Sequence, residues 1–388
     1  MRLKKEVKLT IVLVIFIILL IVLFNVLTSL QKPKGGRTLS LSRNDEVVLH
    51  HEITMMATGD YLIHNIQYLS ACDQSGYCNF DTYTQYLTDI VSQSDVAIFN
   101  YEGTLAQDIY PLGGYPLFNA PNEVLEPMVN AGFNVAATSN NHSLDSRLEG
   151  VVSTLEALEN YGIASFGTTK EYTEEILVKE VNGIKIAFLS YSYGFNGLEG
   201  QYTQEQLNSH VSFLDEELME KEIKMAEELA DLTVVYPHWG DEYHRYPNDS
   251  QVNLAHKMVD WGADLVLGSH PHVLQPTEMV IKDGQKKFII YSMGNFVSNQ
   301  RLETLNNHYT EQGIILEFKI SKSKDQSAVI DNVILHPTWV HRVMEGSKAT
   351  YWVLPTEFEN LSSIVDVNTY ERITNAHQEI IEHLDLDF

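Results

Sequence analysis

The residues Leu265-Val266-Leu267-Gly268-Ser269-His270-Pro271-His272 join a short apolar run to a turn that carries two histidines. An apolar run that ends at glycine predicts a buried strand. Two imidazoles at positions i and i+2 beyond such a strand are expensive to bury without a purpose. In open α/β sheets, ligands bind beyond the carboxyl ends of the strands. We therefore expect a strand at 265–267 whose carboxyl end presents His270 and His272 to a metal ion.

The same succession of apolar run and polar turn recurs along the 388-residue chain. The further strands that enter such turns are predicted at 53–57, 95–99, 134–138 and 232–236. The helices that alternate with them are predicted at 124–131, 148–161, 215–230 and 253–261. This alternation predicts an α/β fold with a largely buried sheet. The candidate metal ligands at the strand ends are Asp60, His64, Glu102, Asn141, His238, His270 and His272.

Carboxylate, amide and imidazole groups in one site suit Mn, Zn or Fe better than the all-oxygen sites of Mg and Ca. A carboxylate shared by two such ions holds them about 3.5–4 Å apart. Each motif alone has an ordinary explanation: Asp60 fits a turn, Glu102 fits an exposed side chain, and Asn141 fits a helix-capping turn. Their joint occurrence, each after a predicted strand, favours two divalent metal ions.

Six segments together resemble the CapA family of capsule and poly-γ-glutamate synthesis proteins. In chain order they are Gly59-Asp60, Asn100-Tyr101-Glu102, Ser139-Asn140-Asn141-His142-Ser143-Leu144-Asp145, His238-Trp239-Gly240-Asp241-Glu242-Tyr243, Gly268-Ser269-His270-Pro271-His272-Val273 and Tyr291-Ser292-Met293-Gly294-Asn295-Phe296. That family is related to the calcineurin-like metallophosphoesterases. The resemblance covers residues 53–300 and implies a four-layer α/β/β/α sandwich of the metallophosphoesterase type.

The resemblance also implies roles for single residues. It gives Asp60 and His272 to a first metal ion and makes Glu102 the bridging group. It gives the second ion the ligands Asn141, His238 and His270. His142 resembles the histidine that protonates the leaving group. Two features depart from the superfamily pattern: His64 stands four residues after Asp60 instead of two, and the bridging residue is Glu102 instead of an aspartate.

Other residues near these motifs have expected roles of their own. Asp145, three residues after His142, either orients the imidazole or caps a helix. An imidazole can act as a general acid because it exchanges protons near neutral pH. Trp239 is either a platform for substrate or a core residue. The candidate substrate-binding residues are Trp239, Glu242, Tyr243 and Asn295.

The run of residues 9–30 contains no charged residue and as a helix would span about 33 Å, the thickness of a bilayer core. A cleaved signal peptide is the alternative, but the run is long and no small-residue cleavage site follows it. We predict a cytoplasmic tail at 1–8, a transmembrane anchor at 9–30 and a linker at 31–50. A CapA-like domain at 51–340 and a C-terminal extension at 341–388 would then lie outside the cytoplasm.

Charge and cysteine content limit the possible partners. Residues 1–45 carry a net charge of +6, whereas the whole chain carries −26, so the remainder carries −32. Such a domain lacks the basic clusters that nucleic acid requires. It would also repel a polyanion at low salt. Cys72 and Cys78 form either a small disulfide loop or two free thiols.

The leading hypothesis is a membrane-anchored extracytoplasmic factor in capsule or poly-γ-glutamate synthesis or export, with a hydrolase-like two-metal site. Its expected partners are membrane-bound synthase subunits and either an anionic polymer or a small phosphoester or γ-glutamyl substrate. A general metal-dependent phosphoesterase or amide hydrolase is the second hypothesis. A non-catalytic scaffold that binds polymer or a synthase is the third.

Overall fold

The computed structural model describes residues 39–41, 47–324 and 326–384. The chain divides into two units, Met1–Leu49 and His50–Phe388. In the first unit, strand β1 (Leu39–Leu41) pairs with the start of β2 (Val47–Leu62). Since β2 begins at Val47, the predicted linker is shorter than 31–50. The predicted anchor at 9–30 lies outside the described residues, and no helix within them is long and apolar enough to cross a membrane.

The larger sheet has nine strands in the order β15-β14-β13-β2-β3-β4-β5, with β1 and β12 pairing with β2. Its further strands are β3 (Val96–Glu102), β4 (Val135–Ala137), β5 (Ala164–Phe166), β12 (Asn295–Val297), β13 (Gln312–Ser323), β14 (Val329–Glu345) and β15 (Lys348–Pro355). Strands β2 to β5 are parallel, whereas β13, β14 and β15 continue the sheet in antiparallel pairs. The carboxyl ends of β2, β3 and β4 therefore meet at one edge.

The smaller sheet has six strands in the order β10-β11-β9-β8-β7-β6. They are β6 (Leu177–Val181), β7 (Ile184–Ser192), β8 (Leu232–His238), β9 (Leu265–Leu267), β10 (Leu274–Lys282) and β11 (Gln285–Met293). The central strands β7, β8, β9 and β11 are parallel, so their carboxyl ends also lie at a common edge. This sheet therefore offers a second set of strand ends where ligands can gather.

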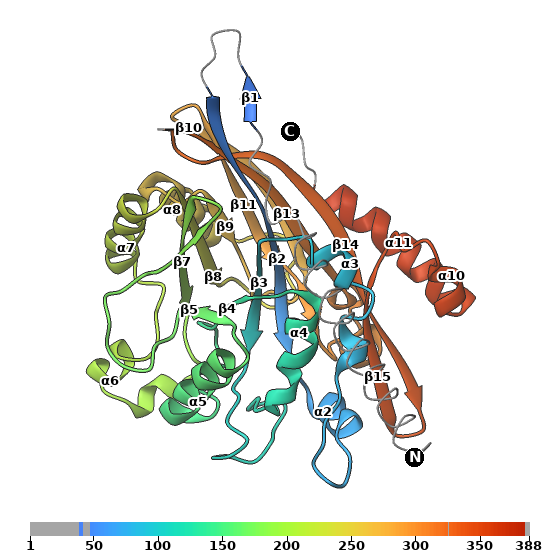
Figure 1. The fold of residues 1–388 in the computed structure, drawn as a ribbon. Coiled ribbons are helices and arrows are strands. Elements are labelled where there is room, and N and C mark those ends of the chain that lie inside the picture. The colour runs from blue at the N-terminus through green and yellow to red at the C-terminus, as the bar shows by residue number, and fades with distance from the viewer. Residues whose placement is uncertain (1–38, 42–46, 325, 385–388) are drawn as a thin grey trace, which may run out of the picture. The chain divides into compact units, whose positions relative to one another are not determined.

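The two sheets face each other across a shared apolar core, with helices on their outer sides (Figure 1). Neighbouring residues on a strand point to opposite faces of the sheet. Ile98 on β3 and Val234 on β8 point inward and pack between the two sheets. Phe99 instead packs against helices of the larger sheet, and Val235 packs against helices of the smaller one. Burial on both faces explains the uninterrupted apolar runs of the sequence. The predicted mixed α/β fold is confirmed.

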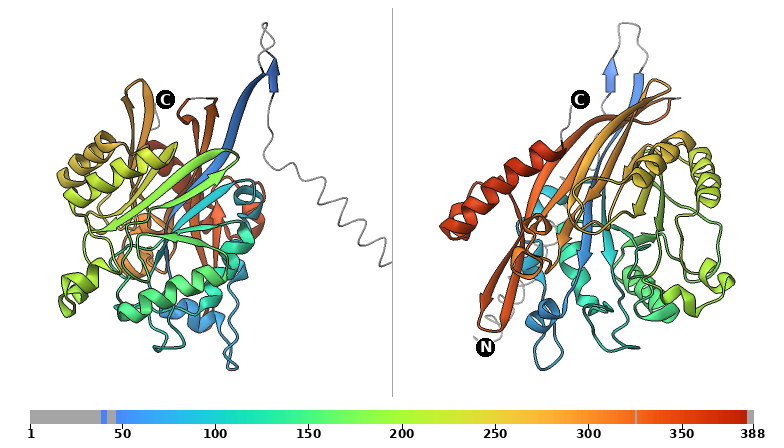
Figure 2. Two further views of the ribbon diagram at one scale, coloured as in Figure 1. Left: turned by 60° about the vertical axis from the view of Figure 1, so that its left-hand side comes forward. Right: turned by 180° about the vertical axis from the view of Figure 1, so that it is seen from behind.

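The helices cover the sheets in two groups, which Figure 2 shows from two further sides. On the larger sheet lie α2 (Asn65–Ala71), α3 (Thr88–Val91), α4 (Leu125–Ala131) and α5 (Arg147–Asn160). On the smaller sheet lie α7 (Glu216–Leu229) and α8 (Asp249–Trp261). The remaining helices and 3-10 turns are η1 (Asp81–Tyr83), η2 (Asn122–Val124), η3 (Leu198–Gln201), α6 (Gln204–Asn208), α9 (Leu302–Leu305), η4 (His308–Glu311), α10 (Leu361–Ile364) and α11 (Val367–Leu384).

The boundary predicted at residue 340 falls inside β14, so it does not divide the structure. Beyond it, β15 pairs with β14 along its whole length. Helix α11 places Ile380 and Leu384 in the core between the sheets. Residues 341–384 are therefore part of the domain and not a peripheral extension. Sequence periodicity is weak here because β15 alternates buried and half-exposed residues, both partly apolar.

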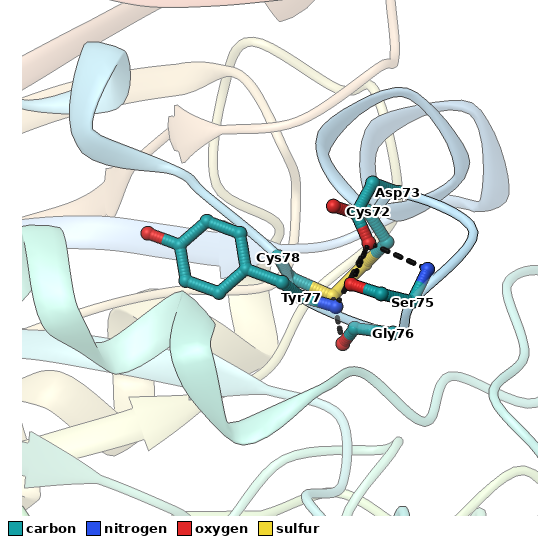
Figure 3. The surroundings of a disulfide bond; sticks show 6 residues. All are labelled: Cys72, Asp73, Ser75, Gly76, Tyr77 and Cys78. Atoms are coloured by element: carbon teal, nitrogen blue, oxygen red, sulfur yellow. Dashed lines mark hydrogen bonds between the residues drawn. A yellow bond between two sulfur atoms is a disulfide. The ribbon is translucent and has the colours of Figure 1, made fainter.

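Cys72 and Cys78 are joined by a disulfide at the end of α2 (Figure 3). The enclosed loop is organised by the Asp73 carboxylate, which accepts hydrogen bonds from the backbone N–H groups of Ser75 at 2.8 Å and Tyr77 at 3.2 Å. The disulfide is therefore the arrangement adopted by the two cysteines, whose pairing the sequence left open.

A buried charge cluster attaches α11 to the larger sheet. The Glu311 side chain is fully buried and pairs with the guanidinium groups of Arg301 and Arg372. Arg301 also donates a hydrogen bond to the Val340 carbonyl at 2.9 Å. Since the three side chains come from a loop, η4 and α11, their pairing holds together segments far apart in the chain.

Replacing Glu311 with glutamine should leave both arginines without their shared counter-charge. We expect the free energy of unfolding to fall by about 3–5 kcal/mol, the usual result of breaking a buried pair. The matched control is Glu303→Gln, which alters a 48% exposed carboxylate beside the same arginines. It should cost about 1 kcal/mol or less. Urea unfolding measures both changes, and equal losses would contradict the assigned role of Glu311.

Candidate metal centre

The predicted ligands lie at the carboxyl ends of strands from both sheets. The larger sheet supplies Asp60 on β2, Glu102 at the end of β3, and Asn141 with His142 after β4. The smaller sheet supplies His238 at the end of β8, and His270 with His272 after β9. These two sets of side chains meet in one place.

The chain crosses from one sheet to the other directly beside this place. Gly294 lies between β11 of the smaller sheet and β12 of the larger one, and its carbonyl accepts a hydrogen bond from the Asp60 N–H at 2.9 Å. A Cβ atom on Gly59 would lie 1.9 Å from the Gly294 carbonyl oxygen. Only glycine permits this approach. The Tyr236 hydroxyl on β8 also donates to the Thr58 carbonyl on β2, which fixes the two edges together.

Asp60, Glu102 and His272 form the first group of possible ligands. One ligand atom from each of them lies within 4.8 Å of the other two. Asp60 Oδ2 is 3.1 Å from His272 Nδ1, and Glu102 Oε1 is 3.6 Å from His272 Nε2. All three residues are buried. Neither oxygen of Glu102 accepts a hydrogen bond from the described residues, so a buried carboxylate is left without a partner.

Asn141, His238 and His270 form the adjoining group. His238 Nε2 lies 2.9 Å from Asn141 Oδ1 and 3.9 Å from Glu102 Oε1. The rings of His238 and His270 are 4.8 Å apart between centroids. His270 Nδ1 is buried and has no hydrogen-bond partner among the described atoms. Glu102 therefore lies between two sets of ligand atoms, the place the resemblance gives to a bridging carboxylate.

The electrostatics of the site suit a cation. Burial raises the pKa of the Glu102 carboxyl well above its usual value. Burial, with His270 and His272 nearby, lowers the pKa of His238 well below its usual value. Burial and His272 lower the pKa of His270 to about 3. Both histidines are thus neutral at physiological pH, the form that binds a metal ion. The unpartnered oxygens and neutral imidazoles fit divalent metal ions.

Several amide and hydroxyl groups orient these ligands. Asn100 Nδ2 donates to Asp60 Oδ1 at 2.9 Å, and Asn140 Nδ2 donates to Asn100 Oδ1 at 3.2 Å. Ser269 Oγ lies 3.0 Å from His238 Nδ1. Such outer partners fix the direction of metal ligands. The sequence alone indicated no role for Asn100, Asn140 or Ser269, although each lies within two residues of a predicted ligand in its motif.

Asn295, which was predicted as a substrate-binding residue, lies in the same supporting set. Its side-chain oxygen lies 3.1 Å from His272 Nδ1. Its amide donates to the Thr310 carbonyl at 2.9 Å and to Gln300 Oε1 at 3.0 Å. Because the side chain is fully buried and its hydrogen-bonding groups are engaged, Asn295 is a positioning residue.

His142 and Asp145 form a buried pair beside the ligands. His142 Nδ1 is 2.7 Å from Asp145 Oδ2, and the Phe118 N–H donates to the same oxygen at 2.6 Å. The Phe118 ring packs edge-on against the His142 ring, with centroids 4.6 Å apart. Asp145 therefore orients His142 and is not the N-cap of α5, which is Ser146.

Two predicted site residues have other contacts than those expected. His64 Nδ1 accepts a hydrogen bond from the Asn299 N–H at 3.3 Å, and His64 belongs to neither group of possible ligands found among the described residues. Trp239 is only 2% exposed and donates to the Tyr291 carbonyl at 2.9 Å, so it is a core residue and not a substrate platform. It follows His238, and neighbouring residues at a strand end point to opposite sides.

The open side of the site carries an acid and two tyrosines. Glu242 is exposed, and a carboxylate oxygen lies within 4.8 Å of ligand atoms of His270 and His272. The Tyr243 ring lies 6.2 Å from the His272 ring between centroids. Tyr193, which sequence analysis missed, is 47% exposed, and its ring centroid lies 4.7 Å from that of His270. Tyr193 follows β7 without a recognisable motif, so only the structure brings it here.

The metal affinity of the site should depend on pH through His272. Burial alone would lower the pKa of this imidazole, but Glu102 and Asp60 raise it to about 9. A proton therefore competes with metal ions below pH 9. We expect metal affinity to rise between pH 7 and 9, by up to about tenfold per pH unit. Calorimetric titration in two buffers of different ionisation enthalpy measures the proton released, and binding at pH 7 without proton release would contradict this assignment.

The chain is similar in sequence to two Bacillus proteins. The PGA biosynthesis protein CapA of Bacillus subtilis (strain 168) is 34% identical over 226 residues, which are 57% of each protein. The capsule biosynthesis protein CapA of Bacillus anthracis is 34% identical over 188 residues, covering 47% of this chain and 44% of that protein. The matches thus span about half the length of these relatives.

Among solved structures, NAD nucleotidase (NadN) of Haemophilus influenzae aligns with a TM-score of 0.43 and 13% identity, over 87% of this chain and 57% of that one. The sequence model of the bacterial capsule synthesis protein PGA_cap matches residues 54–300, which hold every candidate site residue and more than half of the chain. The chain therefore belongs to the bacterial capsule synthesis protein family PGA_cap, the CapA family that its motifs resemble.

Proposed function

We propose that this chain acts in capsule or poly-γ-glutamate synthesis or export through a two-metal, hydrolase-like site of the metallophosphoesterase type. The observation that carries the proposal is the buried Glu102 carboxylate. Neither of its oxygens has a hydrogen-bond partner among the described residues, while the imidazoles of His238 and His272, both from the smaller sheet, lie 3.9 and 3.6 Å from Glu102 Oε1. A buried charge without compensation destabilises the folded state by roughly several kcal/mol, and bound cations would offset that loss.

The side chains divide naturally between two ions. Asp60 and His272 would hold one ion, and the other would be held by a set from both sheets. That second set is Asn141, His238 and His270. Glu102 lies between the sets and would contact both ions. Two bound ions would supply Lewis acidity toward a phosphoryl or acyl oxygen and a water of lowered pKa.

His142 is the proposed general acid. The Asp145 carboxylate accepts a hydrogen bond from His142 Nδ1–H, which leaves Nε2 to give a proton to the leaving group. The Phe118 N–H and ring hold both members of the pair in place. A fixed ring orientation matters because proton transfer requires Nε2 within hydrogen-bonding distance of the leaving atom.

The names of the relatives and the sequence of the chain support the proposed substrate class, location and partners. Both Bacillus relatives are named for biosynthesis of capsule or PGA, which supports a γ-glutamyl polymer or a smaller γ-glutamyl or phosphoester substrate. The apolar run at 9–30 supports a single-pass anchor with the domain outside the cytoplasm, beside membrane-bound synthase subunits. The net charge of −32 after residue 45 favours one other candidate, a scaffold that contacts a synthase without turning over the polymer.

Metal content tests the proposal directly. We expect about two equivalents of Mn, Zn or Fe in the full-length chain, and loss of both ions in Glu102→Ala because that carboxylate contacts both. His270→Ala should lose one ion. Metal binds the folded state, so a chelator should lower the melting temperature of the unaltered chain. Elemental analysis and thermal melts measure these effects. A chain that binds none of these metals under any loading condition would refute the proposal.

The role of the His142–Asp145 pair can be separated from metal binding. In Asp145→Asn the imidazole loses the carboxylate that orients it. We expect kcat toward a chromogenic phosphodiester or a γ-glutamyl anilide to fall by about 10²–10⁴-fold, with KM and metal content retained. A full metal complement with no turnover of either substrate class by the unaltered chain would instead support the scaffold function.

A further inference from the structure

The turn that follows β8 is tied to the loop that carries His270 and His272. The Tyr243 N–H donates to the Pro271 carbonyl at 2.8 Å, and Pro271 stands between the two histidines. At the next residue, Gln275 Nε2 donates to the His244 carbonyl at 2.8 Å. These bonds join the turn to the histidine loop at Pro271 and to the start of β10 at Gln275, so the position of Glu242 is set relative to both imidazoles.

The backbone at this junction adopts conformations that side chains normally avoid. Tyr243, His270 and His272 have φ angles of 68°, 100° and 58°. Non-glycine residues in this region cost roughly 1–3 kcal/mol each and persist where the surroundings impose them, often at ligand sites. The strained turns place a carboxylate oxygen of Glu242 within 4.8 Å of ligand atoms of His270 and His272.

The groups around Glu242 include a ligand atom without a hydrogen-bond partner and no cationic partner for the Glu242 carboxylate among the described residues. His270 is 3% exposed, and its Nδ1 has no hydrogen-bond partner. Within the described part of the chain, no lysine or arginine forms an ion pair with Glu242. His64, which the sequence suggested as a ligand, instead accepts a hydrogen bond from Asn299. Three carboxylates, Asp60, Glu102 and Glu242, then lie close to the imidazoles without a cationic side chain to balance Glu242.

We propose that Glu242 is a metal ligand, which binds one of the two ions together with a histidine of the His270–His272 loop. This inference rests on the proposed two-metal function and adds Glu242 to its ligands, whereas His64, which the sequence suggested, is not among them. The Glu242 carboxylate lies on the exposed side of the site, whereas the other candidate ligands are buried. It therefore supplies the outermost ligand, and its negative charge reduces the net positive charge that the metal pair presents to substrate.

Manganese titration of the full-length chain, in detergent, tests this assignment. Binding is followed by calorimetry and by the electron paramagnetic resonance spectrum of Mn²⁺, in the unaltered chain and in Glu242→Gln. The variant removes one charge with little change of shape. We expect one ion to bind as before and the other to bind about tenfold or more weakly, because loss of even an outer partner of a ligand has an effect of this size.

Asp241→Asn is the matched control, since it removes the same charge from the same turn. Asp241 Oδ2 accepts a hydrogen bond from Asn248 at 2.8 Å, an interaction that asparagine can keep. Both Mn²⁺ affinities should stay within about twofold of the unaltered chain. Unchanged affinities in Glu242→Gln, or equal weakening in both variants, would overturn the assignment of Glu242 alone. Absence of binding of Mn²⁺, and of Zn²⁺ and Fe²⁺ in the same calorimetric titration, in the unaltered chain would overturn the two-metal function and this inference together.

Discussion

The burial of Glu102 between two sheets is the constraint on which the rest of this structure depends. The carboxylate at the end of a central parallel strand is buried, and neither of its oxygens accepts a hydrogen bond from the described residues. Its neighbours are His238 and His272, which come from the opposite sheet. An arrangement of this kind is stable only if cations or protons compensate the charge. The fold therefore requires positive charge to compensate the Glu102 carboxylate where the two sheets meet.

The close contact between the edges of the two sheets brings their candidate ligands together in one place. The parallel strands of each sheet end at one edge, and the chain passes from one edge to the other at Gly294. The contact between Gly59 and the Gly294 carbonyl leaves no space for a side chain. Because both edges are fixed by hydrogen bonds, candidate ligands as far apart in the chain as Asp60 and His272 keep a constant spacing. A two-metal site requires such constancy, since the spacing of the ions is set by their ligands.

The loops that carry the histidines are held as firmly as the strands. Asn295 and Ser269 each fix one imidazole, and Asn100 with Asn140 fixes Asp60. Residues in unfavourable backbone conformations occur in the same loops. Strain of this kind is retained where surrounding contacts impose it, and here those contacts are the supports of the ligands themselves. The exposed side of the site, with Glu242 and Tyr193, is the part left open to solvent.

The sequence by itself determined the α/β class, the family and most of the candidate ligands, because each candidate follows an apolar run and has a chemically distinctive side chain. Residues such as Glu102 and His270 could be identified in this way. The tertiary structure alone decided the places of His64, Trp239 and Glu242, since the direction of a side chain after a strand depends on the turn that follows. It also decided that residues beyond 340 complete the larger sheet. Pairing between distant strands depends on contacts across the whole fold, and local periodicity carries no record of such contacts.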